Sequence, residues 1–323
     1  MNYGTVIDFH LNTEQDHPSG PYVADQSFFP TTTSYFGSSK KPANLYAKEL
    51  LIILRYASLI LCGTPIANGD QTTLHSGWIT HTITPGIIWK SQDFPDLYGA
   101  PQTVNYLEVD LSIHTLHFIE LKGSPKTVST VGLDHRALAA INGAYFDTKT
   151  YQSTTFIKVA GQVLSNANPT EPRQRSAIAI DDTGTIDIIR KPENLPWSKG
   201  LPFRHLLASS PVLVTRSKAW NHANHKYGDH RHPRTAAGIT AENRMILLVV
   251  DGRRKTAAGM NYTELATTMQ ALGCRSALCL DGGGSTTMWI SGRGVVNTPS
   301  TRSLITRLPI ERPVANAVIV RKR

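Results

Sequence analysis

An apolar run that ends in an acid and three glycines most constrains the fold of this chain. Residues 278–287 read Leu-Cys-Leu-Asp-Gly-Gly-Gly-Ser-Thr-Thr. The apolar residues predict a buried strand, and glycine lacks the Cβ atom that hinders φ > 0 in other residues. Backbone N–H groups in such a bend can point at an anion. The segment therefore predicts a phosphate site beside the Asp281 carboxyl, although an ordinary turn after a strand explains the same composition.

The segment before this strand predicts a short helix. Residues 261–273 place apolar side chains at helical spacing, Asn261 can cap the start and Gly273 can end the helix. Glu264 follows Asn261 at the spacing of a capping box. Spacing alone therefore favours a structural role for Glu264 over a catalytic one.

A second apolar run ends in the same way. Residues 245–250 are all apolar, which is typical of a strand covered on both faces, and Asp251, Gly252 and Arg253 follow. If the two strands lie side by side, Asp251, Arg253 and Asp281 converge on one rim. Paired carboxylates there could divide acid and base roles.

Three further polar clusters lie beside apolar segments upstream. They are residues 142–147 (Asn-Gly-Ala-Tyr-Phe-Asp), 173–177 (Arg-Gln-Arg-Ser-Ala) and 232–238 (His-Pro-Arg-Thr-Ala-Ala-Gly). A polar side chain held against the core is rigid, as binding and catalysis require. Each cluster also has an ordinary explanation, such as a turn at Asn142 or a surface ion pair at Arg175.

Taken in order, these segments resemble the phosphodiester glycosidase family. The series is Asn-Gly-x-Tyr-Phe at 142–146, Arg-x-Ala at 175–177, Ser-Ser-Pro at 209–211, His-Pro-Arg-Thr at 232–235, Val-Asp-Gly-Arg at 250–253, the helix of Glu264, and Leu-Asp-Gly-Gly-Gly-Ser at 280–285. The resemblance extends from about residue 106 to residue 320. An ordered set over this length is far more specific than any one of its members.

The resemblance implies a hydrolase acting on a sugar 1-phosphodiester, with N-acetylglucosamine among the candidate sugars, or on a related glycosyl linkage. A phosphodiester is an anion, so its site needs guanidinium groups, N–H donors and a carboxyl that can move a proton. Arg175, Arg234 and Arg253 match the family's arginines and are the expected phosphate clamps. Asp281 and Glu264 match its acids, and we expect one to protonate the leaving oxygen and the other to orient or deprotonate water.

The remaining expected site residues surround these groups. Asn142 is expected to hold a sugar hydroxyl or a phosphate oxygen. The other expected substrate-binding or phosphate-binding residues are Thr235, Asp251, Gly282, Gly283, Gly284 and Ser285. Attack at the anomeric carbon and attack at phosphorus need similar residue types, so both reactions stay open.

A histidine-rich segment raises the question of a metal. Residues 216–232 include His222, His225, His230 and His232. Only His232 belongs to a family motif, and the spacings match no familiar zinc pattern. We therefore expect a solvated loop and no certain cofactor. A divalent metal is the alternative, and it would supply Lewis-acid assistance.

Composition favours one sizeable domain. The chain has 323 residues, of which 40% are hydrophobic and 18% charged, so it can bury a substantial core. Strand-like runs punctuated by glycine predict an α+β fold, a single domain with mixed, mainly antiparallel stacked sheets flanked by a few helices. The net charge of +9 indicates an anionic partner: a phosphorylated glycan, a cell-wall polymer or a membrane surface. We expect no nucleic-acid partner, because no nucleic-acid motif is present.

The chain divides into four expected segments. Residues 1–41 are polar and without period, which indicates disorder or a mis-chosen translation start. Residues 42–62 place lysines before an apolar stretch that ends at Cys62, which resembles a secretory or lipoprotein signal; a helix packed on the domain is the alternative. Residues 63–104 lead into the domain, and residues 105–323 form the catalytic domain. This predicts export to the periplasm or cell surface, with membrane anchoring through Cys62.

Cysteine usage predicts no disulfide framework, because the chain has only three cysteines. Cys279 lies in the predicted buried strand, and Cys274 precedes it. We expect both to be inert core thiols.

Two other classes of function compete with the hydrolase. A non-catalytic carbohydrate-binding or phosphate-binding envelope protein would keep the arginines and glycines without needing Asp281 and Glu264, and both acids are present. A nucleotide-dependent protein of the actin type would need a second glycine-rich phosphate turn near its start, and we identify none. The hydrolase therefore ranks first and the binding protein second.

Overall fold

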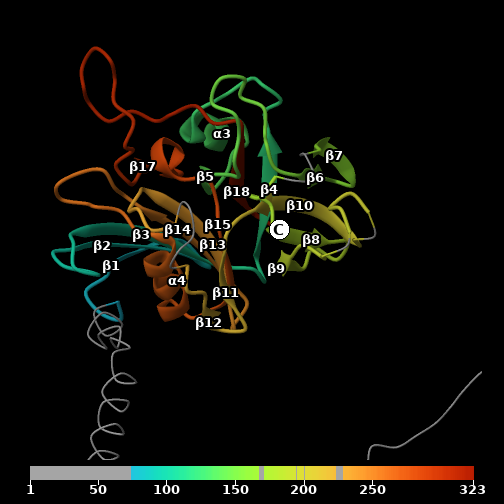
Figure 1. Ribbon diagram of the computed structural model, residues 1–323, viewed down its shortest axis with the longest axis horizontal. Helices are drawn as coiled ribbons and strands as arrows, with labels where there is room; N and C mark the ends of the chain where they lie inside the picture. The colour runs from blue at the N-terminus through green and yellow to red at the C-terminus, as the bar shows by residue number, and fades with distance from the viewer. Residues whose placement is uncertain (1–73, 167–170, 194, 200, 223–227) are drawn as a thin grey trace, which may run out of the picture. The chain divides into compact units, whose positions relative to one another are not determined.

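Three antiparallel sheets form the framework of the part of the chain that the structure describes (Figure 1). The computed structural model describes residues 74–166, 171–193, 195–199, 201–222 and 228–323, all in a compact unit that extends from Thr64 to Arg323. The expected mainly antiparallel sheets are confirmed, but the α+β class is wrong. Only two α-helices occur among the described residues, so the fold is predominantly β. Its apolar runs are short and separated by turns, and such runs suit strands better than helices.

The largest sheet has eight strands in the order β1-β2-β3-β14-β13-β15-β11-β12. Their bounds are Ile79–Thr84 (β1), Ile87–Phe94 (β2), Gln102–Asp110 (β3), Arg244–Val250 (β14), Arg234–Thr240 (β13), Cys274–Cys279 (β15), Val212–Thr215 (β11) and Lys218–Ala219 (β12). Residues 63–104, expected only to lead into the domain, supply β1, β2 and the first residues of β3.

Two five-stranded sheets complete the fold. One has the order β7-β6-β10-β8-β9 and the other the order β17-β16-β5-β18-β4. The first consists of Gln162–Ser165 (β7), Ile157–Val159 (β6), Phe203–Ser209 (β10), Ser176–Asp181 (β8) and Ile186–Arg190 (β9). The second consists of Gly294–Val295 (β17), Met288–Ile290 (β16), Ala139–Asn142 (β5), Asn316–Lys322 (β18) and His114–Glu120 (β4).

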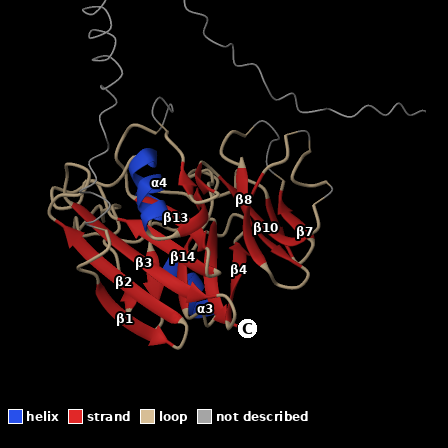
Figure 2. Ribbon diagram, turned by 90° about the horizontal axis from the view of Figure 1, so that it is seen from below, coloured by secondary structure: helices blue, strands red, loops and turns tan. Residues whose placement is uncertain are grey.

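The main core lies between the three sheets. Leu247 of β14, Ile178 of β8 and Val318 of β18 are fully buried in one apolar cluster. The opposite face of the eight-stranded sheet packs against helix α4 (Tyr262–Ala271), as Figure 2 shows. Because β14 is covered on both faces, all its residues after Arg244 are apolar and buried.

The predicted helix is α4. Asn261 caps it and forms a capping box with Glu264, and Gly273 follows at φ +82°. A shorter helix, α3 (Val128–Asp134), packs beside β5 and β16. Local signals were therefore sufficient to predict α4 and both of its ends.

The two apolar strands that end in Asp-Gly are not neighbours. Strand β13 lies between β14 and β15 and is antiparallel to both. The ends of β14 and β15 therefore reach the same rim of the sheet, with Arg234 at the start of β13 between them. The two strand ends therefore share one rim of the sheet, as expected. They are separated by β13, which was not expected.

Several expectations fall outside the described residues. These are the polar segment 1–41, the signal-like segment 42–62 with Cys62, and His225. Among the residues that are described, no helix has the length and apolar character needed to cross a membrane.

Candidate active site

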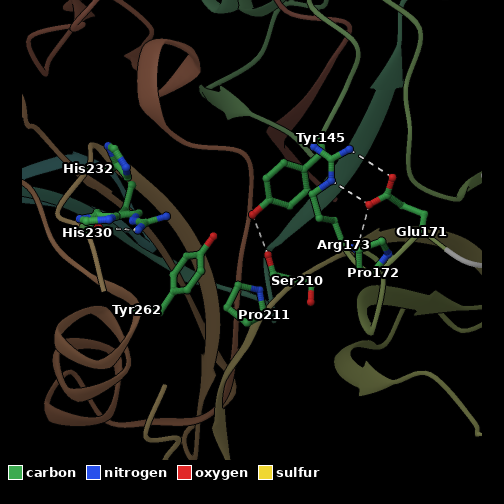
Figure 3. A pocket seen from close by; sticks show the side chains of 10 residues that line it. Tyr145, Glu171, Pro172, Arg173, Ser210, Pro211, His230, His232 and Tyr262 are labelled. Carbon is green, nitrogen blue, oxygen red and sulfur yellow. Dashed lines mark hydrogen bonds and ion pairs between the residues drawn. The ribbon is translucent and has the colours of Figure 1, made fainter. Parts of the chain in front are cut away.

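Two adjoining cavities open at the rim where β13 begins. The larger, of about 840 Å³, is lined by Tyr145, Glu171, Pro172, Arg173, Ser210, Pro211, His230, His232, Arg234 and Tyr262. The smaller, of about 240 Å³, shares Tyr145, His232, Arg234 and Tyr262 and adds Arg253, Asp281, Gly282, Gly283, Gly284 and Arg312. Figure 3 shows Tyr145 and Arg173 on one side of the larger cavity and His230, His232 and Tyr262 on the other.

Asp281 lies in the wall of the smaller cavity, two residues after the end of β15. Its amide N–H donates to Gly143 O (3.0 Å), and its carbonyl accepts from Asn142 Nδ2 (2.6 Å). Burial raises the pKa of the carboxyl to about 6, although the nearby Ser285 hydroxyl, the Gly282 N–H and the charges of Arg312 and Arg173 lower it in part. A carboxyl with this pKa can carry a proton near neutral pH, so it can act as an acid.

The glycine bend lets the chain pass close to the start of β13. A Cβ on Gly282 would lie 2.7 Å from Pro233 O, and Gly283 has φ +62°. The Gly282 N–H, however, donates to Asp281 Oδ1 (2.9 Å), and the Gly283 N–H donates to Pro233 O (2.8 Å). The Gly282 and Gly283 N–H groups therefore do not point at an anion as expected, because the bend uses both of them internally.

Three arginines, Arg234, Arg253 and Arg312, line the smaller cavity. Arg234 is 5% exposed; it donates to Met260 O (2.8 Å) and His230 O (3.0 Å), and its guanidinium lies 4.0 Å from the centroid of the Tyr262 ring. Burial and the charges of Arg312 and Arg234 lower the pKa of Arg253. This mutual repulsion of guanidinium groups favours a bound anion.

Arg173, rather than the expected Arg175, faces the larger cavity. Arg175 is exposed and lines neither cavity. The Arg173 guanidinium lies 5.1 Å from the centroid of the Tyr145 ring, and its Nε is 2.7 Å from Glu171 Oε1. These contacts turn Arg173 toward the site.

Asn142 and Thr235 lie behind Asp281 instead of facing the cavities. Asn142 is 1% exposed, and its Oδ1 accepts from Thr235 Oγ1 (2.7 Å) and from the Thr287 N–H (3.2 Å). Its Nδ2 donates to the Asp281 carbonyl. Asn142 therefore positions Asp281 by joining the end of β5 to the end of β15. Ser285 is likewise fully buried and lines neither cavity.

Asp251 does not reach the site, although it was expected to bind substrate. Asp251 is 1% exposed and accepts from Arg254 Nη2 (2.8 Å), Asn297 Nδ2 (3.0 Å) and the Thr298 N–H (3.0 Å). It therefore secures the segment that follows β17.

Glu264 also lies away from both cavities. Its carboxylate accepts from the Asn261 N–H (2.9 Å) and from Arg231 Nε (3.0 Å). Asp281 and Glu264 are not a facing pair, so the expected division of acid and base roles between them lacks geometric support.

Two histidines of the expected solvated loop belong to the cavity walls. His232 lines both cavities, and burial, followed by the charges of Arg234 and Arg253, lowers its pKa. His230 lines the larger cavity, whereas His222 Nε2 lies 2.8 Å from Val212 O. Within the described ranges, no group of three or more His, Cys, Asp or Glu side chains has the geometry to hold a metal ion.

The cysteines behave as expected. Cys274 and Cys279 are free and buried, and burial raises the pKa of each thiol to about 12. They are inert core residues.

Sequence reasoning missed Arg173, Arg312, Tyr145, Tyr262 and His230 as site residues. Tyr145 stands in the Asn-Gly-x-Tyr-Phe motif, so a signal for it existed. Arg312 follows a long loop and belongs to none of the recognised motifs. Only the tertiary fold brings it to the glycine bend.

Comparison with known proteins identifies the family. Residues 135–321 match the family model of the phosphodiester glycosidases. The chain belongs to this family. The match extends from just before β5 through most of β18, so it includes every residue that lines the two cavities described above, and the expected resemblance is confirmed.

A curated relative matches a smaller part of the chain. The chain is 29% identical over 110 residues to the SPbeta prophage-derived uncharacterized protein YomE of Bacillus subtilis (strain 168). The match covers 33% of this chain but only 16% of the length of that relative.

Solved structures share the fold of this protein. The zebrafish N-acetylglucosamine-1-phosphodiester alpha-N-acetylglucosaminidase catalytic domain, auto-inhibited by its pro-peptide, aligns with a TM-score of 0.63 and 22% identity over 77% of this chain and 89% of that one. A hypothetical protein from Synechocystis aligns with a TM-score of 0.61 and 16% identity over 77% and 64%. A putative exported protein from Burkholderia pseudomallei aligns with a TM-score of 0.53 and 16% identity over 70% and 75%.

Proposed function

We propose that this protein hydrolyses a sugar 1-phosphodiester, with Asp281 as the proton donor. One observation carries the proposal: a carboxyl whose pKa is raised to about 6 lines a small cavity together with Arg234, Arg253 and Arg312. An anion held by the three guanidinium groups would lie beside a carboxyl that can release a proton.

The two cavities suit the two parts of such a substrate. The smaller cavity, with its arginines, would take the phosphodiester. The larger cavity presents the rings of Tyr145 and Tyr262 and the prolines Pro172 and Pro211, and such surfaces pack against sugar rings or an apolar aglycone. Arg173, at the side of the larger cavity, would bind a second polar group of the substrate.

Substrate binding would favour the protonated form of Asp281. The charges of Arg312 and Arg173 lower the pKa of this carboxyl in the free protein. A bound phosphodiester would neutralise part of that positive charge, so the pKa of Asp281 would rise further. The carboxylic acid would then protonate the leaving oxygen as its bond to the anomeric carbon or to phosphorus breaks. A water molecule would form the new bond at that atom, and the proton that the water loses would restore the carboxylic acid. Asn142 and Glu264 would support this step by positioning backbone and helix, without touching the substrate.

The relatives suggest the first substrates and the compartment. The zebrafish protein is named for an N-acetylglucosamine 1-phosphodiester, so we propose such diesters as the first substrates to test here. The Burkholderia protein is named as a putative exported protein. We likewise propose export for this chain, with anchoring through Cys62 and an anionic glycan or cell-wall polymer as the natural substrate.

The test is hydrolysis of a panel of sugar 1-phosphodiesters by wild-type protein and Asp281→Asn. We expect the substitution to lower kcat by about 100-fold or more while calorimetry shows unchanged binding of the diester. Each assay is repeated with a chelator, and a loss of rate would add a metal to the mechanism. Binding by the wild type without turnover would instead identify a non-catalytic binding protein.

A further inference from the structure

The loop between β17 and β18 carries an exposed apolar tip. Leu304 is 86% exposed and Ile305 is 92% exposed, and Leu308 and Ile310 follow at 63% and 43%. These are four of the ten exposed large hydrophobic side chains found in the described residues. In Figure 1 the loop extends away from the sheets as a red trace above β17. We refer to residues 302–310 as the apolar loop.

The apolar loop is held by its own hydrogen bonds. The Ser303 N–H donates to Leu308 O (2.9 Å), and the Arg307 N–H donates to Ser303 O (3.0 Å). The Ser303 hydroxyl accepts from the Thr306 N–H (3.1 Å). At the base of the loop the Ile310 N–H donates to Thr301 O (2.9 Å). The backbone is therefore a closed turn that presents Leu304 and Ile305 outward.

Two basic side chains flank this tip. Arg302 and Arg307 flank it and are exposed, and the sequence contains no acidic residue from Gly282 to Ile310. Glu311, the next acid, accepts from the Ser129 N–H (2.9 Å) and is turned toward helix α3. The surface around Leu304 and Ile305 thus complements an anionic surface, in agreement with the net charge of +9.

We propose that the apolar loop inserts Leu304 and Ile305 into an anionic lipid bilayer, with Arg302 and Arg307 at the head-group phosphates. Apolar side chains with basic neighbours are the combination that binds membrane interfaces. A second protein is a poorer occupant, because stable protein interfaces bury about 800 Å² on each partner and their centres favour aromatic side chains. The apolar loop offers four exposed aliphatic side chains and no aromatic one.

The residues on either side of the apolar loop contact or line the wall of the smaller cavity. Ser300 Oγ donates to Gly283 O (3.3 Å), Thr301 Oγ1 donates to Gly284 O (3.4 Å), and Arg312 lines the cavity. Docking of the tip would therefore bring the cavity to the level of the lipid head groups. Membrane binding by the loop does not itself depend on the proposed hydrolase activity.

A fluorophore on the loop reports its insertion directly. In the full chain carrying Cys62→Ser, Thr306→Cys is labelled with the environment-sensitive dye NBD, since Cys274 and Cys279 are buried. We expect a blue shift of the emission, and quenching by lipid-borne nitroxides, with vesicles of phosphatidylcholine and phosphatidylglycerol. A label at Asp182→Cys, exposed between β8 and β9, is expected to show neither change. Adding Leu304→Ser and Ile305→Ser to the loop-labelled protein is expected to abolish the shift.

The NBD emission reports the environment of the loop only. The test therefore remains valid even if another segment also binds the protein to the vesicles. No shift at Thr306→Cys with anionic vesicles would overturn the proposal. An equal shift with pure phosphatidylcholine would overturn the role of Arg302 and Arg307. A shift that grows with protein concentration in the absence of lipid would show that a second copy, and not a bilayer, covers the tip.

Discussion

At the scale of single residues, the chemistry depends on how the Asp281 carboxyl is surrounded. Burial raises its pKa to about 6, although two arginines oppose that rise. The charges of Arg312 and Arg234 also repel that of Arg253, and a bound anion would offset this repulsion. The protonation of Asp281 and the charge of the ligand should therefore be coupled.

The rate of hydrolysis should depend on pH through Asp281. If the protonated carboxyl is the donor, kcat/KM is expected to be level at low pH and to fall as pH rises through about 6. The measurement is a profile of kcat/KM for a sugar 1-phosphodiester between about pH 4 and pH 8. A rate that instead increases through the same range would make the carboxylate a base or a nucleophile.

The same pKa makes a prediction about stability. The usual pKa of 3.8 applies to Asp281 in the unfolded chain, and the folded value is about 6. The folded state therefore holds the proton more tightly, so this carboxyl lowers the free energy of unfolding as pH rises from about 4 to 6. We expect Asp281→Asn to be more stable than wild type at pH 8 and the difference to shrink at pH 4, by urea denaturation. Equal stabilities at both values would contradict the raised pKa.

Arg312 and Arg175 form a matched pair for testing the anion site. Arg312 lines the smaller cavity, whereas Arg175 lines neither cavity. Loss of a charge-assisted hydrogen bond costs about 1.5–3 kcal/mol, so Arg312→Ala is expected to raise KM by about 10-fold or more. Arg175→Ala is expected to leave KM unchanged. A larger effect of Arg175→Ala would contradict this assignment. It would mean that Arg175, of the Arg-x-Ala motif, binds the substrate and that Arg312 does not.

At the scale of elements, helix α4 shows that one residue can fit two roles. Glu264 fits the family's acid, yet its carboxylate closes the capping box and pairs with Arg231. The pair is partly exposed, so solvent screens it and its contribution to stability is small. The contacts of Glu264 therefore indicate a structural role at the N-terminal turn of α4 and not a role in the cavity.

Glu264→Gln separates these roles. Glutamine can keep the capping box but loses the ion pair with Arg231, so we expect the free energy of unfolding to fall by about 1 kcal/mol or less. Turnover is expected to stay within about twofold of wild type. Denaturation and steady-state kinetics measure both. A loss of about 100-fold in kcat with unchanged stability would restore Glu264 as a catalytic acid.

The elements also show what the sequence could predict. Helix α4 and its ends were predictable because caps and helical periodicity are local. The buried strands β14 and β15 were predictable from their apolar runs, but the placing of β13 between them depends on pairings among distant residues. Arg173 was missed for a similar reason. The ring of Tyr145, far away in the sequence, and the nearby Glu171 together turn Arg173 toward the cavity.

At the scale of the whole molecule, the net positive charge should attract the anionic substrate and increase its rate of association. The net charge is +9, and four arginines line the two cavities. The Debye length falls from about 10 Å at 0.1 M salt to about 3 Å at 1 M, so kcat/KM for a phosphodiester is expected to decrease with added salt. Arg312→Ala is expected to weaken that dependence. A rate unaffected by salt in the wild type would mean that long-range attraction contributes nothing.

The predicted fold class was only partly right at this scale. Mainly antiparallel sheets follow from the short apolar runs and the glycine turns. The share of helix was overestimated, because the described chain places most of its apolar segments in strands and adds only α3 and α4. Segments 1–41 and 42–62, and the export that they predict, stay predictions.

The smaller cavity joins two kinds of structure that can change separately. Asp281 follows a central strand and is tied to Asn142 of another sheet, whereas Arg312 comes from the end of a long loop. Loops tolerate insertion and replacement far better than paired strands do. Changes in the loop that carries Arg312 could therefore alter substrate specificity while Asp281 keeps its position. Proteins of this fold could in this way act on many different phosphodiesters.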